Sequence, residues 1–148
     1  MIRDPLNETD HLVDPAYGSG VMLRELVDGL VGNSLTAAAK QHSVVINEVR
    51  QGVVLQTPNP RYVEIIDELI SIIILHSNRG DIHIAAQKQP GEILIKIQER
   101  NNNNGYALSF SLGAMQSEIN NAGASLDMND MQKKVATIVF SFPDRKVA

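Results

Sequence analysis

The first half of the chain alternates between segments with helical spacing of apolar residues and short β-branched runs. Residues 21–39 carry apolar positions every third or fourth residue, which predicts a helix that two internal glycines weaken. Residues 43–49 and 53–55 are rich in valine and predict two strands. A second helix is predicted over about 60–77, because a proline marks its start and Asn78-Arg79-Gly80 marks its end.

Strict alternation dominates the second half of the chain. Residues 82–86 and 93–97 each place isoleucines on one face, and Pro90-Gly91 between them predicts a hairpin. After an asparagine-rich loop, a third helix is predicted over 107–121. A closing hairpin follows over 125–142, with a polar turn around Gln132-Lys133. Its last strand predicts one buried face formed by Ala136, Ile138, Phe140 and Phe142.

Composition narrows the classes of function. The net charge of −4 gives no basic surface for nucleic acid, so no nucleic-acid partner is expected. The chain has no cysteine, which excludes disulfides, thiol catalysis and thiolate metal sites and is typical of a reducing cytoplasm. The longest apolar stretch, Ile70–Leu75, is too short to cross a bilayer, and the first residues lack the apolar core of a signal peptide. We therefore expect a soluble, cytoplasmic protein with no membrane insertion.

The histidines do not form a recognisable catalytic or metal-binding pattern, so neither a catalytic residue nor a metal is predicted. His11 follows Asp10 and so resembles a phosphoacceptor histidine next to an acidic residue, but Pro5 and Pro15 bracket this segment and disfavour the long helix that such a histidine needs. We expect His76 at a helix end and His83 on a strand surface. The four histidines are His11, His42, His76 and His83.

Several segments in the order described above resemble the catalytic ATPase domain of histidine kinases, the GHKL or Bergerat type. They are Leu23–Val27 with Ala39–Val44, then Pro60–Ile66, then Phe110–Met128 with Ala122-Gly123-Ala124-Ser125 at the family's His-Gly-Gly turn. The resemblance covers most of the chain and implies an α/β (α+β) two-layer sandwich. The expected sheet is mixed but mostly antiparallel, with about five strands and three helices on one face. Residues 1–20 would form an extended lead-in with a short strand near 11–13, and 21–148 the ATPase-like domain, without a dimerisation or phosphoacceptor domain.

The resemblance also shows which residues occupy the family's nucleotide pocket. Ile72 stands where the family has a magnesium-binding asparagine, and it offers no oxygen ligand. Glu68, one turn earlier, would bind magnesium or act as a base, or it is simply a solvated acidic residue, which we favour. Glu99 and Asn101 occupy the Asp-x-Gly-x-Gly turn that binds adenine, but the glycines are absent. A surface ion pair of Glu99 with Arg100 is the interpretation we favour there.

The phosphate-binding part of the family pattern is also altered. Only residues 100–106 separate the adenine turn from the next helix, which leaves no room for the family's mobile lid. The glycine loop is replaced by Ala107-Leu108-Ser109-Phe110-Ser111, whose side chains hinder close approach of backbone N–H groups to phosphate. Thr137, on the last strand, completes the set of pocket positions. No cofactor is therefore expected.

The leading hypothesis is a non-catalytic signalling domain that binds a protein: a kinase, a response regulator or a second copy of itself as a homodimer. The alternative is an ATP- and magnesium-dependent kinase of the histidine-kinase or anti-sigma-factor serine kinase type, using Glu68 and Glu99. A third alternative is a phosphorelay protein whose histidine domain a partner supplies. The unusually apolar helix over 62–75 fits either a filled nucleotide pocket around Ile72, which we favour, or a partner surface.

Overall fold

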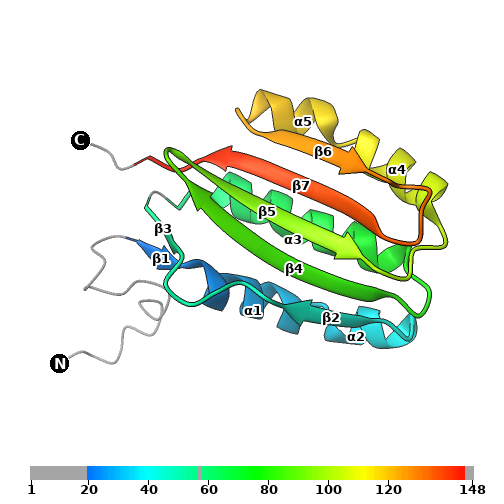
Figure 1. Ribbon diagram of the computed structural model, residues 1–148. Helices are drawn as coiled ribbons and strands as arrows, with labels where there is room; N and C mark the ends of the chain where they lie inside the picture. Colours follow the sequence, from blue (N-terminus) through cyan, green and yellow to red (C-terminus); the bar gives the residue numbers. More distant parts are fainter. Residues whose placement is uncertain (1–19, 57, 146–148) are drawn as a thin grey trace.

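The computed structural model describes residues 20–56 and 58–145 (Figure 1). The predicted strand near 11–13 and His11 lie outside these residues. In chain order the elements are β1 (Val21–Met22), α1 (Leu23–Asn33), α2 (Leu35–Lys40), β2 (Val44–Asn47), β3 (Val54–Leu55), α3 (Pro60–Leu75), β4 (Asp81–Gln89), β5 (Glu92–Glu99), α4 (Gly105–Gly113), α5 (Gln116–Asn121), β6 (Ser125–Asn129) and β7 (Ala136–Pro143).

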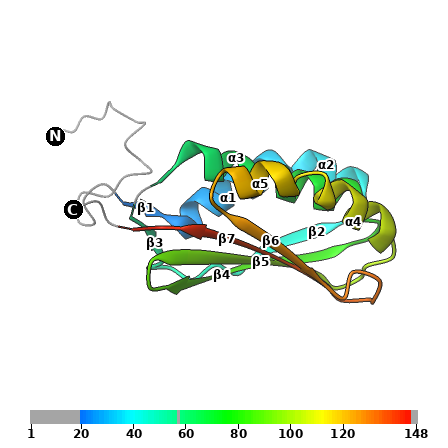
Figure 2. The ribbon, with the colours of Figure 1, turned by 90° about the horizontal axis from the view of Figure 1, so that it is seen from above.

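Five strands form one sheet in the order β2-β4-β5-β7-β6. The β2–β4 pair is parallel and the other three pairs are antiparallel, so the sheet is mixed and mostly antiparallel as predicted. The helices cover one face of this sheet, and no described element covers the other, which we call the open face (Figure 2). The two-layer α+β sandwich expected from the sequence is thus confirmed. A separate two-stranded sheet joins β1 to β3.

Helix α3 lies against the middle of the sheet and supplies much of the core. It begins where predicted, because the Asn59 side chain accepts the Arg61 N–H at 2.9 Å and Pro60 is the first helical residue. Its apolar residues pack against the inward isoleucines of β4 and β5 and against an aromatic group on β7, whose Phe140 and Phe142 ring centres are 5.3 Å apart. The buried α3 residues are Tyr62, Ile65, Ile66, Leu69, Ile70, Ile73 and Ile74.

The two other predicted helices are each broken into two. The first starts only at Leu23, because Val21 and Met22 pair with β3, and it breaks at Ser34 into α1 and α2. Ser34 is buried and non-helical, with φ −105° and ψ 2°. The third helix starts at Gly105, two residues earlier than predicted, and breaks around Met115 into α4 and α5. Gly32, Asn33 and Ser34 at the first break and Gly113 beside the second have weak helix propensity, so interrupting the helix there costs little free energy.

None of the helices in the described ranges is both long enough and apolar enough to span a membrane.

Candidate functional site

Most of the predicted pocket positions lie near the place where α3 and β5 end and α4 begins. Along α3, Glu68 is exposed, as we favoured, and Ile72 is half-buried against the core. Glu99 ends β5 on the helix-facing side of the sheet and is 2% exposed. The structure therefore does not bring Glu68 and Glu99 together: one carboxylate faces solvent from the outer side of α3, and the other is enclosed beneath the helical layer.

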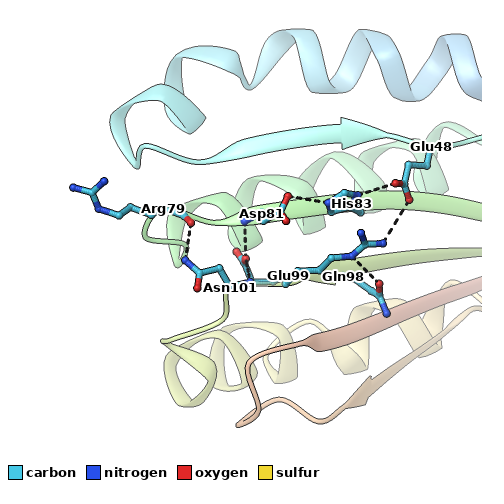
Figure 3. Close-up of polar contacts among 8 residues, drawn as sticks. Glu48, Arg79, Asp81, His83, Gln98, Glu99 and Asn101 are labelled. Carbon is cyan, nitrogen blue, oxygen red and sulfur yellow. Dashed lines mark hydrogen bonds and ion pairs between the residues drawn. The ribbon is translucent and has the colours of Figure 1, made fainter.

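The predicted surface pair between Glu99 and Arg100 is wrong. One Glu99 oxygen, Oε2, accepts the backbone N–H groups of Asp81 and Asn101, each at 2.9 Å (Figure 3). Arg100 points elsewhere, toward Gln98 Oε1 at 3.2 Å and Glu48 Oε1 at 3.9 Å. Because the chain turns just after Glu99, its carboxylate can accept from backbone donors of that turn and of the neighbouring β4. Consecutive charges in a strand point to opposite faces, so pairing along the chain was a poor guide.

The other Glu99 oxygen, Oε1, has no hydrogen-bond partner among the described residues and lies against the start of β4. A Cβ added to Gly80 would overlap Oε1 and come within 2.8 Å of the Ser77 Cβ. Beside it, the Ser43 and Ser77 hydroxyls are 2.7 Å apart, and Ser43 Oγ also accepts the Gly80 N–H at 2.8 Å. Glycine is thus required at position 80 by close packing around a buried carboxylate.

Asn101 belongs to the same cluster. Its backbone N–H donates to Glu99, and its Nδ2 donates to the Arg79 carbonyl oxygen at 2.9 Å. The side chain thereby ties the end of β5 to the turn that precedes β4. Of the predicted pocket positions, Glu99 and Asn101 are the two that the structure joins by a direct hydrogen bond.

The loop after β5 is held against the β6–β7 turn, which covers residues 130–135. Asn102 Nδ2 donates to the carbonyl oxygens of Met131 at 2.7 Å and Lys133 at 2.8 Å, and the Asn102 N–H donates to Lys134 at 2.8 Å. Immediately afterwards α4 begins at Gly105, where a Cβ would overlap the Met131 carbonyl oxygen. The backbone of the β6–β7 turn therefore fills the space beside the first residue of α4.

The remaining predicted positions are dispersed around this end of the fold. Ala107, Ser109 and Ser111 are all half-buried on α4. Ser111 Oγ contacts His76 Nε2 at 2.8 Å, which links α4 to the end of α3 and confirms His76 as a helix-end residue. Thr137 lies on the open face of the sheet, where its hydroxyl accepts from Gln98 Nε2 at 3.2 Å. Thr137 is consequently separated from the other positions by the sheet itself.

His83 is the polar residue that sequence analysis misjudged most. It was expected on a strand surface, yet it is buried on the open face, with Nδ1 2.8 Å from Glu48 Oε2 and Nε2 2.8 Å from Asp81 Oδ1 (Figure 3). Asp81 and His83 are two residues apart on one strand and so point to the same face, which would have indicated the Asp81–His83 contact from the sequence. Glu48 comes from the loop after β2, which only the parallel β2–β4 pairing brings alongside.

These groups do not assemble into a metal site: within the described ranges no cluster of three or more histidine or acidic side chains is placed to hold an ion. Glu48 and Asp81 flank His83 on opposite sides rather than converging on one point. The carboxylates at this end of the fold instead satisfy backbone and imidazole donors.

Three exposed apolar side chains lie on α3 and α4 near this end. Phe110 is 82% exposed, Tyr106 76% and Leu75 64%. Tyr106 and Phe110 are four residues apart on α4 and so share one helix face. Leu75 is the last residue of α3, next to the His76–Ser111 link between the two helices. We call these three residues the α3–α4 apolar surface.

The fold is that of histidine kinase catalytic domains. A nucleotide-free catalytic domain of histidine kinase ThkA superposes with a TM-score of 0.63 and 11% identity, over 84% of this chain and 94% of that one. A histidine kinase from Burkholderia phymatum gives 0.69 and 11%, over 84% and 70%. ThkA in complex with the response regulator TrrA gives 0.64 and 12%, over 85% and 41%. No family model and no curated protein sequence matches the chain.

Proposed function

We propose that residues 21–148 form a histidine-kinase-like domain that acts in bacterial two-component signalling by binding another protein and does not bind ATP. In this proposal it is a cytoplasmic pseudokinase. The fold supports the signalling part of the proposal, because it is shared with catalytic domains of histidine kinases. The geometry of the altered pocket supports the loss of nucleotide binding.

The observation that carries the proposal is the enclosure of Glu99. A carboxylate that recognises adenine must present an oxygen to the base amino group. Here Oε2 already accepts two backbone N–H groups, and Oε1 is directed at Gly80 in a side chain that is 2% exposed. For a base to reach Oε1, the turn at Gly80 and the Ser43–Ser77 pair would have to move. The carboxylate therefore fits a structural role better than a binding role.

Phosphate and magnesium also lack suitable groups. A phosphate site at a helix start needs backbone N–H groups that can be approached closely. The first residue of α4 instead packs against the Met131 carbonyl oxygen, which is an acceptor and would repel phosphate oxygens. Ile72 offers no oxygen to magnesium, and Glu68 faces solvent away from Glu99. All of these features point away from ATP chemistry.

The α3–α4 apolar surface supports the protein-binding part of the proposal. Tyr106 and Phe110 form a two-residue aromatic stripe with no partner in the core, and Leu75 adds an aliphatic group nearby. Exposed aromatic residues of this kind are enriched at protein interfaces. ThkA, which has this fold, is known in complex with a response regulator. A response regulator, a kinase or a second copy of this chain is accordingly the partner we propose.

The test is affinity capture from the protein's own cell extract, with the bound protein identified by mass spectrometry and self-association followed by sedimentation. We expect the Tyr106→Ser/Phe110→Ser double variant to lose one partner that the unaltered protein captures. Val44→Ser is the matched control, because Val44 is 57% exposed but lies on the open face. Equal capture or equal self-association by all three proteins would remove the α3–α4 apolar surface from the proposal.

A further inference from the structure

A hollow of about 640 Å³ lies on the open face of the sheet, away from the α3–α4 apolar surface and from Glu99. It exists because β2 leaves the sheet early. The last β2–β4 pair is Asn47 with Ile84, and the ladder ends at the Glu48 N–H bond to the Ile84 carbonyl oxygen at 2.7 Å. Residues 85–88 of β4 pair with β5 on one side but have no strand on the side that β2 has left, and the loop of residues 48–53 borders this gap. We call this space the open-face hollow.

The floor of the open-face hollow is apolar. Ala85, Leu94 and Val139 come from β4, β5 and β7 and line it from three adjacent strands. All three are only half-buried, so their apolar surface is in contact with solvent. A volume of this size falls within the range typical of small-molecule sites, about 300–1,000 Å³.

The rim of the hollow carries uncompensated positive charge. Arg50 and Lys96 line it, and neither side chain has a hydrogen bond or ion pair within the described ranges. Lys88 is engaged with the Val54 carbonyl oxygen at 3.0 Å and with Asp144. The lining carboxylate, Glu48, is already bound to His83 and faces Arg100. Two free cations thus border an apolar floor, in a chain whose net charge is −4.

From this combination we propose that the open-face hollow binds a small amphipathic anion, with its apolar body on Ala85, Leu94 and Val139 and its carboxylate between Lys96 and Arg50. Burial of apolar surface supplies most of the affinity, and the two cations select an anionic over a neutral ligand. The proposal does not depend on the loss of ATP binding or on a protein partner.

The test is an NMR titration of the full chain with octanoate, followed on the methyl groups of Leu94 and Val139. We expect saturable shifts there, about fivefold weaker binding of 1-octanol, and about fivefold weaker octanoate binding in Lys96→Gln. Lys133→Gln is the control for net charge, because Lys133 lies in the β6–β7 turn and pairs with Asp130. We expect it to bind octanoate like the unaltered protein.

A second variant, Ala85→Phe, fills the floor without changing charge, and we expect it to abolish the saturable shifts. Thermal unfolding of each variant checks that the fold is retained. The proposal is overturned if octanoate produces no saturable shift at Leu94 and Val139. That result is also expected if another part of the chain or a protein partner occupies the hollow. Equal binding of octanol, or equal weakening by Lys133→Gln, overturns it as well.

Discussion

The packing of the β6–β7 turn against the start of α4 makes a sharp prediction for Gly105→Ala. Gly105 has a negative φ, so alanine suffers no backbone penalty there and the effect is steric alone. The added Cβ would overlap the Met131 carbonyl oxygen, which belongs to the backbone and cannot rotate away. To relieve the overlap, the turn and the Asn102 hydrogen bonds that hold it must shift.

The magnitude follows from two opposing terms. Overpacking of this kind costs about 1–3 kcal/mol, and replacing glycine by alanine in a helix returns up to about 1 kcal/mol. The expected net loss in the free energy of unfolding is about 1–2 kcal/mol, which lowers the melting temperature of a chain this size by about 3–6 °C. Gly113→Ala, at the other end of α4, is the matched control, because nothing lies within 4 Å of its added Cβ. We expect it to stabilise by about 0.5–1 kcal/mol.

Urea unfolding followed by circular dichroism measures both variants. The two midpoints should move in opposite directions at an unchanged slope. If Gly105→Ala is as stable as Gly113→Ala, the turn does not fill the space beside α4, and the argument that phosphate is excluded there loses its basis.

Two further predictions concern the core and the loop. Phe140→Ala should lower the free energy of unfolding in urea by about 3–5 kcal/mol, because the ring is fully buried. Phe110→Ala should change it by less than about 0.5 kcal/mol, because that ring is exposed. Similar losses in the two variants would contradict the assigned burial. Asn102→Ala should lower the free energy of unfolding by about 1–2 kcal/mol, because it removes two side-chain hydrogen bonds to the β6–β7 turn. Asn103→Ala should lower it by less than half of that, because the single side-chain hydrogen bond of Asn103 is exposed and 3.3 Å long. Equal hydrogen-exchange protection of the turn in both variants would show that Asn102 does not hold it.

Much of the fold was predictable because periodicity reports burial directly. The alternation in β5 and β7 fixed the buried faces, and Asn59-Pro60 fixed the start of α3. The breaks at Ser34 and Met115 were not predictable, since each depends on how the flanking helices pack. Neither periodicity nor composition indicates where a continuous apolar pattern is interrupted by tertiary contacts.

The site was less predictable than the fold because its contacts are long-range. Glu99 was singled out from the sequence, but its partners lie across the β4–β5 pair and in the following turn, so an ion pair with its chain neighbour was the wrong inference. His83 was missed for a similar reason: Glu48 is 35 residues away and reaches it only through the parallel strand pair. The sequence also did not show which apolar residues of α3 are buried. Most of them lie in the core, Ile72 is half-buried and Leu75 is exposed.

The central claim, that the altered pocket does not bind nucleotide, is tested most directly by calorimetric titration of the full chain with ATP and ADP, with and without magnesium. The account predicts no saturable heat up to about 1 mM nucleotide, a limit that corresponds to a binding free energy of about −4 kcal/mol. One-site saturation that disappears in Glu99→Ala, with the variant still folded by circular dichroism, would contradict the account and identify the chain as an ATP-binding kinase-like domain.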